Sequence, residues 1–364
     1  MSYCLCDTIY QDMLSVGSQF LGFVIGQKIG QGAFGEIYSC VDQNNGLLWA
    51  IKTESSDAKR KTLFFEFQIL THIQSSPYFP RLGTFGKGIH FSFYSMELLG
   101  PSLSAIIKAI PDHRLSFSTA IRTCYHILKG IEALHVFGFI HRDIKPGNVL
   151  SREGSECPLS IIDFGLSHVY IDPNTGKHVS QRNRVGFRGT KIYASINAHQ
   201  GFDLSRRDDL ISWFYLSIEL VTGWLPWRDK ISKSEILELK LGFDLDKILS
   251  SNMLEFKNIW AHISSLSFID KPDYHLIYTI LERIMHQSYV EMNSAYDWCS
   301  MLTSYRSKVG QSLNSLNIKT DIPYVKQIDS SKNQKIQDNL LGPYLNVHPP
   351  FSQSSESNHC CCEC

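Results

Sequence analysis

The chain has 364 residues, of which 43% are hydrophobic and 19% are charged, so it can bury at least one large core and form two lobes. Its 35 basic and 35 acidic residues give a formal net charge of zero, which argues against a general nucleic-acid-binding protein. No apolar run approaches the roughly 18 residues that a membrane-spanning helix needs, and the N-terminus lacks the features of a secretory signal.

Single cysteines are scattered through the body of the chain, as reduced thiols are, and not spaced as a disulfide framework. They are Cys40, Cys124, Cys157 and Cys299. We therefore expect a cytoplasmic protein.

The first third of the chain predicts a small, strand-rich lobe. Residues 1–20 are expected to form a short, flexible polar leader, after which alternation of apolar and polar residues predicts strands over 23–29, 35–41 and 47–52. Asn44-Asn45-Gly46 is a strong hairpin turn between the last two of these strands.

A helix with Glu66 among apolar residues follows, and then two further strands. These strands bracket 86–88 and end at Met96. We expect the N-terminal lobe to cover about 21–97.

The remainder of the folded region predicts a larger, helical lobe over about 101–305. Apolar residues recur at helical spacing in 117–137, 208–223, 234–240 and 274–286. From 306 onward Ser, Asn, Gln and Lys dominate, which predicts a mostly disordered tail over 306–364. The expected fold is therefore α+β and bilobal, with one domain over 21–305.

A glycine-rich segment follows the first predicted strand. Gly30, Gly32 and Gly35 fit the pattern G-x-G-x-x-G, with the aliphatic Ile37 two places on. Glycines let backbone N–H groups approach phosphate oxygens closely. A plain glycine-rich hairpin and a dinucleotide-binding turn are alternatives, but the latter should open a helix. A strand follows here, which favours a loop lying over ATP.

Lys52 and Glu66 form a candidate ion pair. Lys52 ends the third predicted strand and Glu66 lies fourteen residues later on the predicted helix. In phosphoryl-transfer sites a strand lysine contacts the α- and β-phosphates and is held by a helix glutamate. The alternative is that both side chains are solvated charges. Glu66 stands between two phenylalanines, however, which is an unusual place for a carboxylate without a partner.

The segment from His141 to Asn148 has the pattern H-R-D-x-x-x-x-N, and Asp163-Phe164-Gly165 follows it. Asp143 is expected to orient a substrate hydroxyl, and Lys145, typical of Ser/Thr-directed enzymes, to stabilise charge on the moving phosphoryl group. Asn148 and Asp163 supply hard oxygen ligands of the kind that Mg²⁺ requires.

With these motifs, residues from about 23 to 300 resemble a eukaryotic protein kinase domain, and more narrowly the casein kinase 1 family. That family has Ser-Ile-Asn where other kinases have Ala-Pro-Glu, and here Ser195-Ile196-Asn197 stands in that place. The other matching segments are Met96-Glu97-Leu98-Leu99-Gly100-Pro101-Ser102-Leu103, Ser205-Arg206-Arg207-Asp208-Asp209-Leu210, Leu225-Pro226-Trp227, Pro272-Asp273-Tyr274 and Asp297-Trp298.

The resemblance implies a non-specific serine/threonine protein kinase that uses ATP and Mg²⁺ and acts on protein substrates. It implies that Met96 is the gatekeeper, that backbone groups of Glu97 and Leu99 bind adenine, and that Ile29 borders the nucleotide with the glycine-rich loop. It also implies that Asp209 is a buried aspartate bracing the catalytic loop, and that activation needs no loop phosphorylation.

The subgroup stays open. Gly186-Phe187-Arg188-Gly189-Thr190 and Leu225-Pro226-Trp227-Arg228 resemble tau-tubulin kinases, whereas 172–178 is closer to ordinary casein kinase 1 members.

One departure from the family's sequence pattern concerns substrate choice. The family usually has an arginine where this chain has Ile192, and that arginine helps to bind a phosphate already on the substrate. The neighbouring Lys191 offers a point charge but no bidentate fork, so we expect weaker dependence on primed substrates.

The C-terminus carries a cysteine cluster made of Cys360, Cys361, Cys362 and Cys364. An unmodified exposed thiol cluster and an adventitious metal site are alternative interpretations of this cluster. Exposed thiols are reactive, so we favour the interpretation that these cysteines are covalently modified. Some casein kinase 1 proteins end in palmitoylated cysteine clusters, and Cys-x-Cys ends also carry geranylgeranyl groups. Two or more lipid chains would give stable membrane anchoring.

Two other functions are alternatives to an active protein kinase. A pseudokinase scaffold should have lost at least one catalytic or ATP-binding residue, but none of Lys52, Glu66, Asp143, Asn148 and Asp163 is missing. A small-molecule kinase is disfavoured by Lys145 and by the Ser-Ile-Asn signature. No feature suggests an obligate interface, so we expect a monomer.

Overall fold

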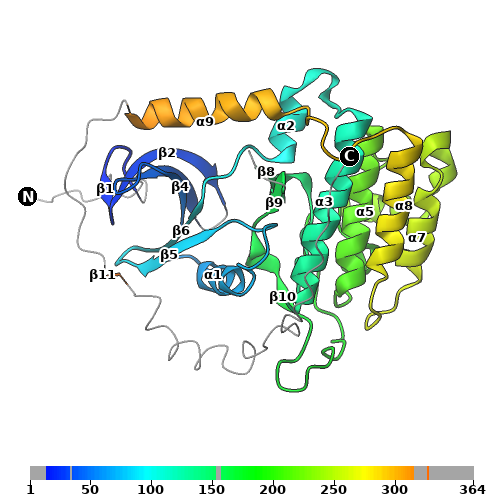
Figure 1. Cartoon of the computed structure of the whole chain (residues 1–364). Helices are drawn as coiled ribbons and strands as arrows, with labels where there is room; N and C mark the ends of the chain where they lie inside the picture. Colours follow the sequence, from blue (N-terminus) through cyan, green and yellow to red (C-terminus); the bar gives the residue numbers. More distant parts are fainter. Residues whose placement is uncertain (1–13, 33–34, 153–156, 315–325, 328–364) are drawn as a thin grey trace, which may run out of the picture.

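The computed structural model describes residues 14–32, 35–152, 157–314 and 326–327, and its first part is a curled antiparallel sheet (Figure 1). The strands are β1 (Gln19–Phe20), β2 (Phe23–Gln31), β3 (Glu36–Asp42), β4 (Leu48–Ser55), β5 (Leu82–Lys87), β6 (Phe91–Glu97) and β11 (Lys326–Gln327). They pair in the order β1-β2-β3-β4-β6-β5-β11. The predicted strands of the N-terminal lobe are therefore confirmed.

The predicted hairpin turn joins β3 to β4. Gly46 has φ of 69°, a left-handed conformation that a side chain disfavours, and its N–H donates to the Asp42 carbonyl at 2.8 Å. The turn between β5 and β6 lies two residues later than expected, because Gly86 and Lys87 belong to β5.

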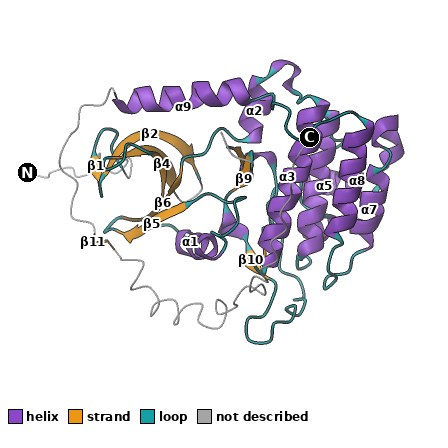
Figure 2. Ribbon diagram, in the orientation of Figure 1, coloured by secondary structure: helices purple, strands orange, loops and turns teal. Residues whose placement is uncertain are grey.

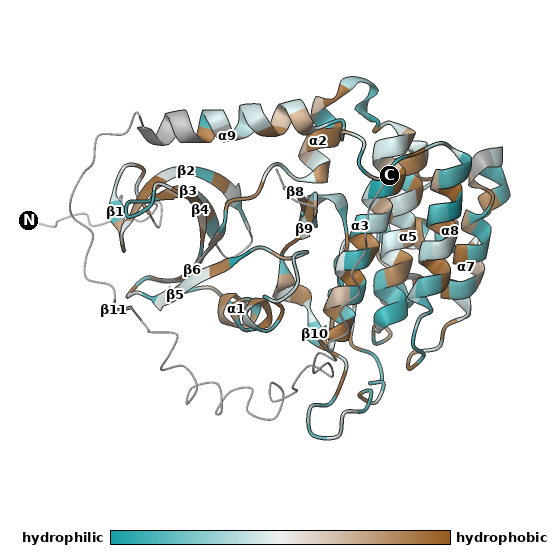
Figure 3. Cartoon of the chain, in the orientation of Figure 1, coloured by the Kyte–Doolittle hydropathy of each residue, from teal (hydrophilic) through white to brown (hydrophobic). Residues whose placement is uncertain are grey.

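Helix α1 (Leu63–His72) packs on this sheet. The ring centroids of Phe67 and Phe85 of β5 are 4.9 Å apart. Figure 3 shows α1 coloured as largely hydrophobic, as expected for a helix with neighbours on most of its surface. Glu66 is a buried exception, and it faces the cavity described below.

Helices dominate the second lobe (Figure 2). They are α2 (Leu103–Ala109), α3 (Phe117–Val136), α4 (Ile196–Gln200), α5 (Arg206–Thr222), α6 (Lys233–Leu241), α7 (Phe256–Ser265), α8 (Tyr274–Gln287) and α9 (Cys299–Asn314). Helix α5 lies against α3, and Trp213 of α5 is fully buried and donates its Nε1–H to the Cys124 carbonyl at 2.9 Å. The four predicted helices are confirmed to within two residues at each end.

Two short antiparallel ladders border the space between the lobes. They pair β7 (Phe139–Ile140) with β10 (His168–Val169), and β8 (Val149–Ser151) with β9 (Leu159–Ile161). The segment that holds His141, Asp143 and Asn148 runs from β7 to β8, so both its ends are fixed by ladder hydrogen bonds.

Three boundaries differ from those expected. The described part of the leader is packed and not free, because Leu14 and Phe20 are buried beside the sheet. The boundary at 305 falls inside α9, which continues to Asn314 and lies against β2 and β3 (Figure 1). Residues 326–327 of the expected tail pair with β5, and the cysteine cluster at 360–364 lies outside the described residues.

The four singly placed cysteines are free thiols, with Cys299 exposed and the others buried. Within the part of the chain that the structure describes, no helix is both long and apolar enough to cross a membrane.

Candidate active site

A cavity of about 450 Å³ opens between the two lobes. Eight of the residues predicted from the sequence to bind ATP or metal line it: Gly30, Gly32, Gly35, Ile37, Lys52, Glu66, Asn148 and Asp163. Met96, the predicted gatekeeper, lines it as well. Residues from β2, β3, β4, α1 and the second lobe therefore converge as the motifs indicated.

The other predicted ATP-binding residues, Ile29, Glu97 and Leu99, are not among the residues that line this cavity. The N–H of Glu97 donates to the Arg81 carbonyl at 2.8 Å, so at this residue only the carbonyl oxygen is a candidate for adenine. The roles of all three residues stay predictions.

The glycine-rich segment lies close over β4. A Cβ added at Gly35 would approach the Thr53 carbonyl oxygen to 1.7 Å, which no side chain permits. The N–H of Gly32 donates to the Gly35 carbonyl at 2.8 Å and closes the turn. Residues 33 and 34 lie outside the described residues.

Lys52 of β4 lines the cavity and forms ion pairs with residues of both lobes. Its Nζ lies 2.5 Å from Glu66 Oε2 and 3.6 Å from Asp163 Oδ1. Burial opposes the charge of Lys52, but the Glu66 carboxylate, with Tyr94 and Asp163, outweighs burial and raises the lysine pKa. The ammonium is therefore charged and available to a phosphate.

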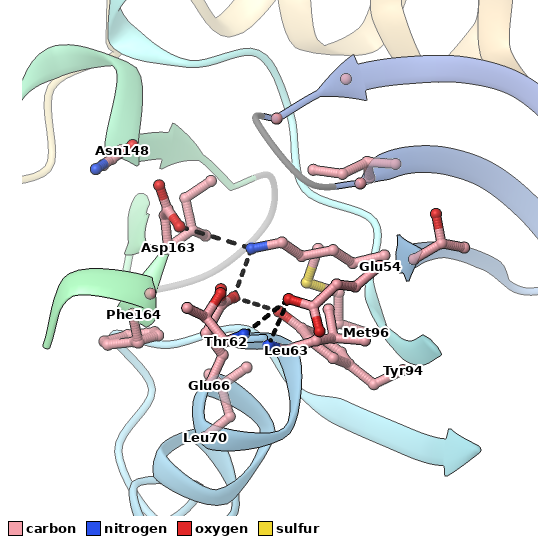
Figure 4. A pocket seen from close by; sticks show the side chains of 18 of the residues that line it. Glu54, Thr62, Leu63, Glu66, Leu70, Tyr94, Met96, Asn148, Asp163 and Phe164 are labelled. Carbon is pink, nitrogen blue, oxygen red and sulfur yellow. Dashed lines mark hydrogen bonds and ion pairs between the residues drawn. The ribbon is translucent and has the colours of Figure 1, made fainter. Parts of the chain in front are cut away.

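Two further side chains hold α1 in this position. Glu54, two residues after Lys52 on β4, accepts hydrogen bonds at Oε1 from the N–H groups of Thr62 (2.8 Å) and Leu63 (3.1 Å). Tyr94 of β6 donates its hydroxyl to Glu66 Oε2 at 3.3 Å. Figure 4 shows Glu54 beside the start of α1.

Asp163, which directly precedes Phe164-Gly165, has an uncommon backbone conformation. Its φ of 70° and ψ of 73° are left-handed, while the Phe164 ring is buried between Phe79 and His141. The Asp163 side chain is 45% exposed, yet the surrounding protein partly desolvates it and so opposes its ionisation; Lys52 outweighs this desolvation and lowers the pKa of the carboxyl. An ionised oxygen donor therefore faces the cavity.

Asp143 forms a second polar centre with Lys145 and Thr190. Lys145 Nζ donates to Asp143 Oδ2 at 2.6 Å and to Thr190 Oγ1 at 3.1 Å. The Thr190 hydroxyl in turn donates to Asp143 Oδ1 at 2.7 Å. A carboxylate so fixed presents an acceptor for a substrate hydroxyl with a cation beside it.

The approach of Thr190 depends on Gly189. Its φ of 93° and a Cβ that would lie 2.7 Å from the Arg142 carbonyl oxygen both require glycine.

Asn148 and Asp163 fit a divalent cation. The Asn148 Nδ2 donates to the Asp143 carbonyl at 2.9 Å, so its amide nitrogen is committed to the protein and its oxygen is left for a ligand. Figure 4 shows Asn148 and Asp163 next to each other on one side of the cavity. One amide and one carboxylate oxygen beside the expected phosphates are the donors that a hard cation prefers.

Asp209 braces the catalytic segment as predicted. Its two carboxylate oxygens accept the backbone N–H groups of His141 (2.6 Å) and Arg142 (2.7 Å), and Oδ2 also contacts His135 Nε2 at 2.9 Å. Burial would raise the pKa of Asp209, but these hydrogen bonds and the nearby histidines lower it. The buried carboxylate fixes the positive φ of Arg142, which is 67°.

Three of the residues that hold this site were not predicted from the sequence: Glu54, Tyr94 and Thr190. Thr190 is separated from Asp143 by 47 positions. In the sequence, Glu54 resembles an ordinary solvated charge. A periodicity argument that placed Glu54 on the same strand face as Lys52 would have found it.

Comparison with known proteins agrees with the phosphoryl-transfer motifs found in this site. The family model described as "Protein kinase domain" matches residues 23–292. A protein of Dictyostelium discoideum named a probable serine/threonine-protein kinase is 34% identical over 287 residues, which are 78% of this chain. The aligned region spans 58% of the length of that relative.

Proposed function

This chain belongs to the protein kinase domain family, and from that membership we propose that it is an ATP-dependent serine/threonine protein kinase of the casein kinase 1 type. The observation that carries the proposal is the assembled site. Lys52, Glu66 and Asp163 lie in contact within one cavity, and Asp143, Lys145 and Thr190 form a hydrogen-bonded group beside Asn148.

The chemistry follows from these positions. Lys52 holds the nucleotide phosphates, and Asp143 accepts a hydrogen bond from the serine or threonine hydroxyl and orients it toward the γ-phosphoryl group. Lys145 offsets negative charge as the phosphoryl group moves. Asn148 and Asp163 would hold Mg²⁺, which when bound supplies charge neutralisation at the phosphates.

The casein kinase 1 assignment is supported by the way Ser195-Ile196-Asn197 is anchored. The Ser195 hydroxyl donates to Asp208 Oδ1 at 2.6 Å, and Asn197 Nδ2 donates to the same oxygen at 2.9 Å. Asp208 also caps α5 by accepting the Ser205 N–H at 2.9 Å. This motif therefore has a buried partner of its own.

The alternative is a pseudokinase scaffold that binds ATP without transferring phosphate. It is disfavoured because the residues that a scaffold loses are present and in contact. The distinguishing experiment is Mg²⁺-ATP transfer by the full chain onto peptides that differ only in a serine, threonine or tyrosine acceptor. Asp143→Asn and Asp163→Asn serve as blanks. Transfer to serine and threonine above both blanks supports the proposal; ATP binding without any transfer supports the scaffold.

The position of Ile192 supports weak dependence on a primed substrate. Ile192 packs against the core, and its carbonyl accepts the Trp227 Nε1–H at 2.8 Å. The Lys191 ammonium donates to the Ile231 carbonyl at 2.9 Å, and Arg182 is paired with Asp203 at 2.8 Å. A large preference for a phosphoserine three residues before the target would contradict this part of the proposal.

We also propose that the protein is a cytoplasmic monomer held at membranes through lipids on Cys360, Cys361, Cys362 and Cys364. The support is the sequence of the C-terminus, since these residues lie outside the described part. Deletion of 360–364 is expected to move the protein from the membrane fraction to the soluble fraction. Unchanged fractionation would contradict the anchor.

A further inference from the structure

A guanidinium group is buried beside the hinge, by which we mean the segment 96–103 that joins the two lobes. Arg152 follows β8 in the second lobe, and its side chain is 8% exposed. Its Nε donates to Glu97 Oε1 at 3.2 Å and its Nη2 to Glu97 Oε2 at 3.0 Å. These two nearly parallel hydrogen bonds form the bidentate geometry that only arginine provides.

The same guanidinium also binds the first lobe. Arg152 Nη2 donates to the Phe79 carbonyl at 2.9 Å, and Nη1 donates to the Pro77 carbonyl. Pro77 and Phe79 lie between α1 and β5, whereas Glu97 ends β6. One side chain of the second lobe thus ties together two segments of the first.

Both ends of this connection are rigid. The N–H of Arg152 donates to the Pro158 carbonyl at 2.8 Å, next to the β8–β9 ladder. The N–H of Ile161 in β9 donates to the Tyr78 carbonyl at 2.9 Å. On the other side, the Glu97 carboxylate also accepts the Arg81 N–H at 3.1 Å. The guanidinium therefore joins a ladder to a fixed carboxylate and not to a mobile loop.

We propose that Arg152 is a positioning residue for nucleotide binding, which holds Glu97 and so sets the hinge where adenine binds. The inference rests on the proposed function, because the resemblance to casein kinase 1 implies that a backbone group of Glu97 binds adenine. Arg152 lies at the hinge and not among the reacting groups, so its loss weakens nucleotide binding in the ground state and transition state alike. Such a loss appears in KM and leaves kcat nearly unchanged.

The test compares full-length Arg152→Ala and Arg152→Lys with the matched control Arg81→Ala. The Arg81 side chain is 75% exposed and contacts the same Glu97 carboxylate at 3.7 Å, so it matches the charge but not the burial. The readouts are KM for ATP, kcat, and the ADP dissociation constant measured by calorimetry.

Arg152→Ala is expected to raise KM and the ADP dissociation constant about tenfold, with kcat within about twofold. Arg152→Lys is expected to recover only part of the loss, because an ammonium cannot form the two parallel bonds. Arg81→Ala is expected to leave all three constants within about twofold, as exposed pairs do.

Unchanged ADP binding in folded Arg152→Ala would overturn the proposal, as would a fall in kcat at constant KM. If Arg152→Ala does not fold, Arg152→Met combined with Glu97→Gln removes both buried charges at similar volume. That variant is expected to fold and to show the same rise in the ADP dissociation constant; wild-type binding by it would overturn the proposal. ADP binding by wild type without phosphate transfer would contradict the proposed function alone.

Discussion

Glu54 replaces the missing cap of α1, and its removal is predicted to lower activity through the position of Glu66. Thr62 stands at the N-cap but makes no side-chain capping hydrogen bond. The first N–H groups of α1 are instead bound by Glu54 from β4. Lys52 and Glu54 are two residues apart, so one strand face holds the helix at both its N-terminus and Glu66.

The magnitude follows from the two hydrogen bonds. Loss of an N-cap costs about 0.5–2 kcal/mol, and hydrogen bonds to a charged acceptor lie at the upper end of the usual range. A loss of about 2 kcal/mol changes the ratio of docked to undocked α1 about thirtyfold. We expect Glu54→Ala to lower kcat/KM by about tenfold, which is less than the change in this ratio. The reason is that the first part of the change costs no activity while most molecules still have α1 docked, with Glu66 on Lys52.

The assay is steady-state transfer onto a serine peptide, with thermal unfolding recorded in parallel. Glu54→Gln is the matched control, because it keeps a carbonyl acceptor and loses only the charge. It is expected to lose about threefold in kcat/KM. If Glu54→Ala lowers the melting temperature but leaves kcat/KM unchanged, Glu54 stabilises the fold without positioning Glu66, and the reasoning is refuted.

Three further predictions concern the second lobe. Asp209→Ala leaves the buried N–H groups of His141 and Arg142 without an acceptor, so kcat should fall at least a hundredfold and stability by about 3–5 kcal/mol; wild-type kcat would contradict the brace. Burial lowers the pKa of Lys240 to about 6 from 10.5, so the unfolded chain binds more protons between these values. The stability of wild type relative to Lys240→Met should therefore rise from pH 6.5 to pH 9 in denaturant titrations, and a constant difference would refute the shift. Ile192→Arg introduces the arginine that the resemblance to casein kinase 1 implies at this position, and should raise the ratio of kcat/KM for phosphorylated over unphosphorylated peptides about tenfold; an unchanged ratio would show that residue 192 does not contact the phosphate.

The fold could be predicted where sequence periodicity was long and regular. The helices around Cys124 and Trp213 were predicted because apolar residues recur every three to four positions over many turns. Helix α9 was not predicted, because polar residues dominate its sequence; among its side chains that the structure describes, Met301, Leu302 and Val309 pack on the core. Its contacts with β2 and β3 arise only in the folded chain.

The residues of the site likewise fall into those that could be predicted from the sequence and those that could not. Asp143, Lys145, Asn148 and Asp163 lie within a short stretch whose local spacing carries the chemistry, so they could be predicted. Arg152 could not, since its partners Pro77, Phe79 and Glu97 lie 55 to 75 positions away along the chain. Long-range hydrogen bonds leave no periodic signal in one sequence.

Lys52, Glu66 and Asp163 are in contact in one cavity, and the resemblance to casein kinase 1 implies that transfer needs no prior phosphorylation of the loop that follows Gly165. The most direct measurement is the initial rate of transfer from Mg²⁺-ATP to a serine peptide by phosphatase-treated full chain, with Asp163→Asn as the blank. We expect transfer above the blank from the first time point, without a lag. A lag that shortens with prior autophosphorylation, or no transfer at all, would contradict it.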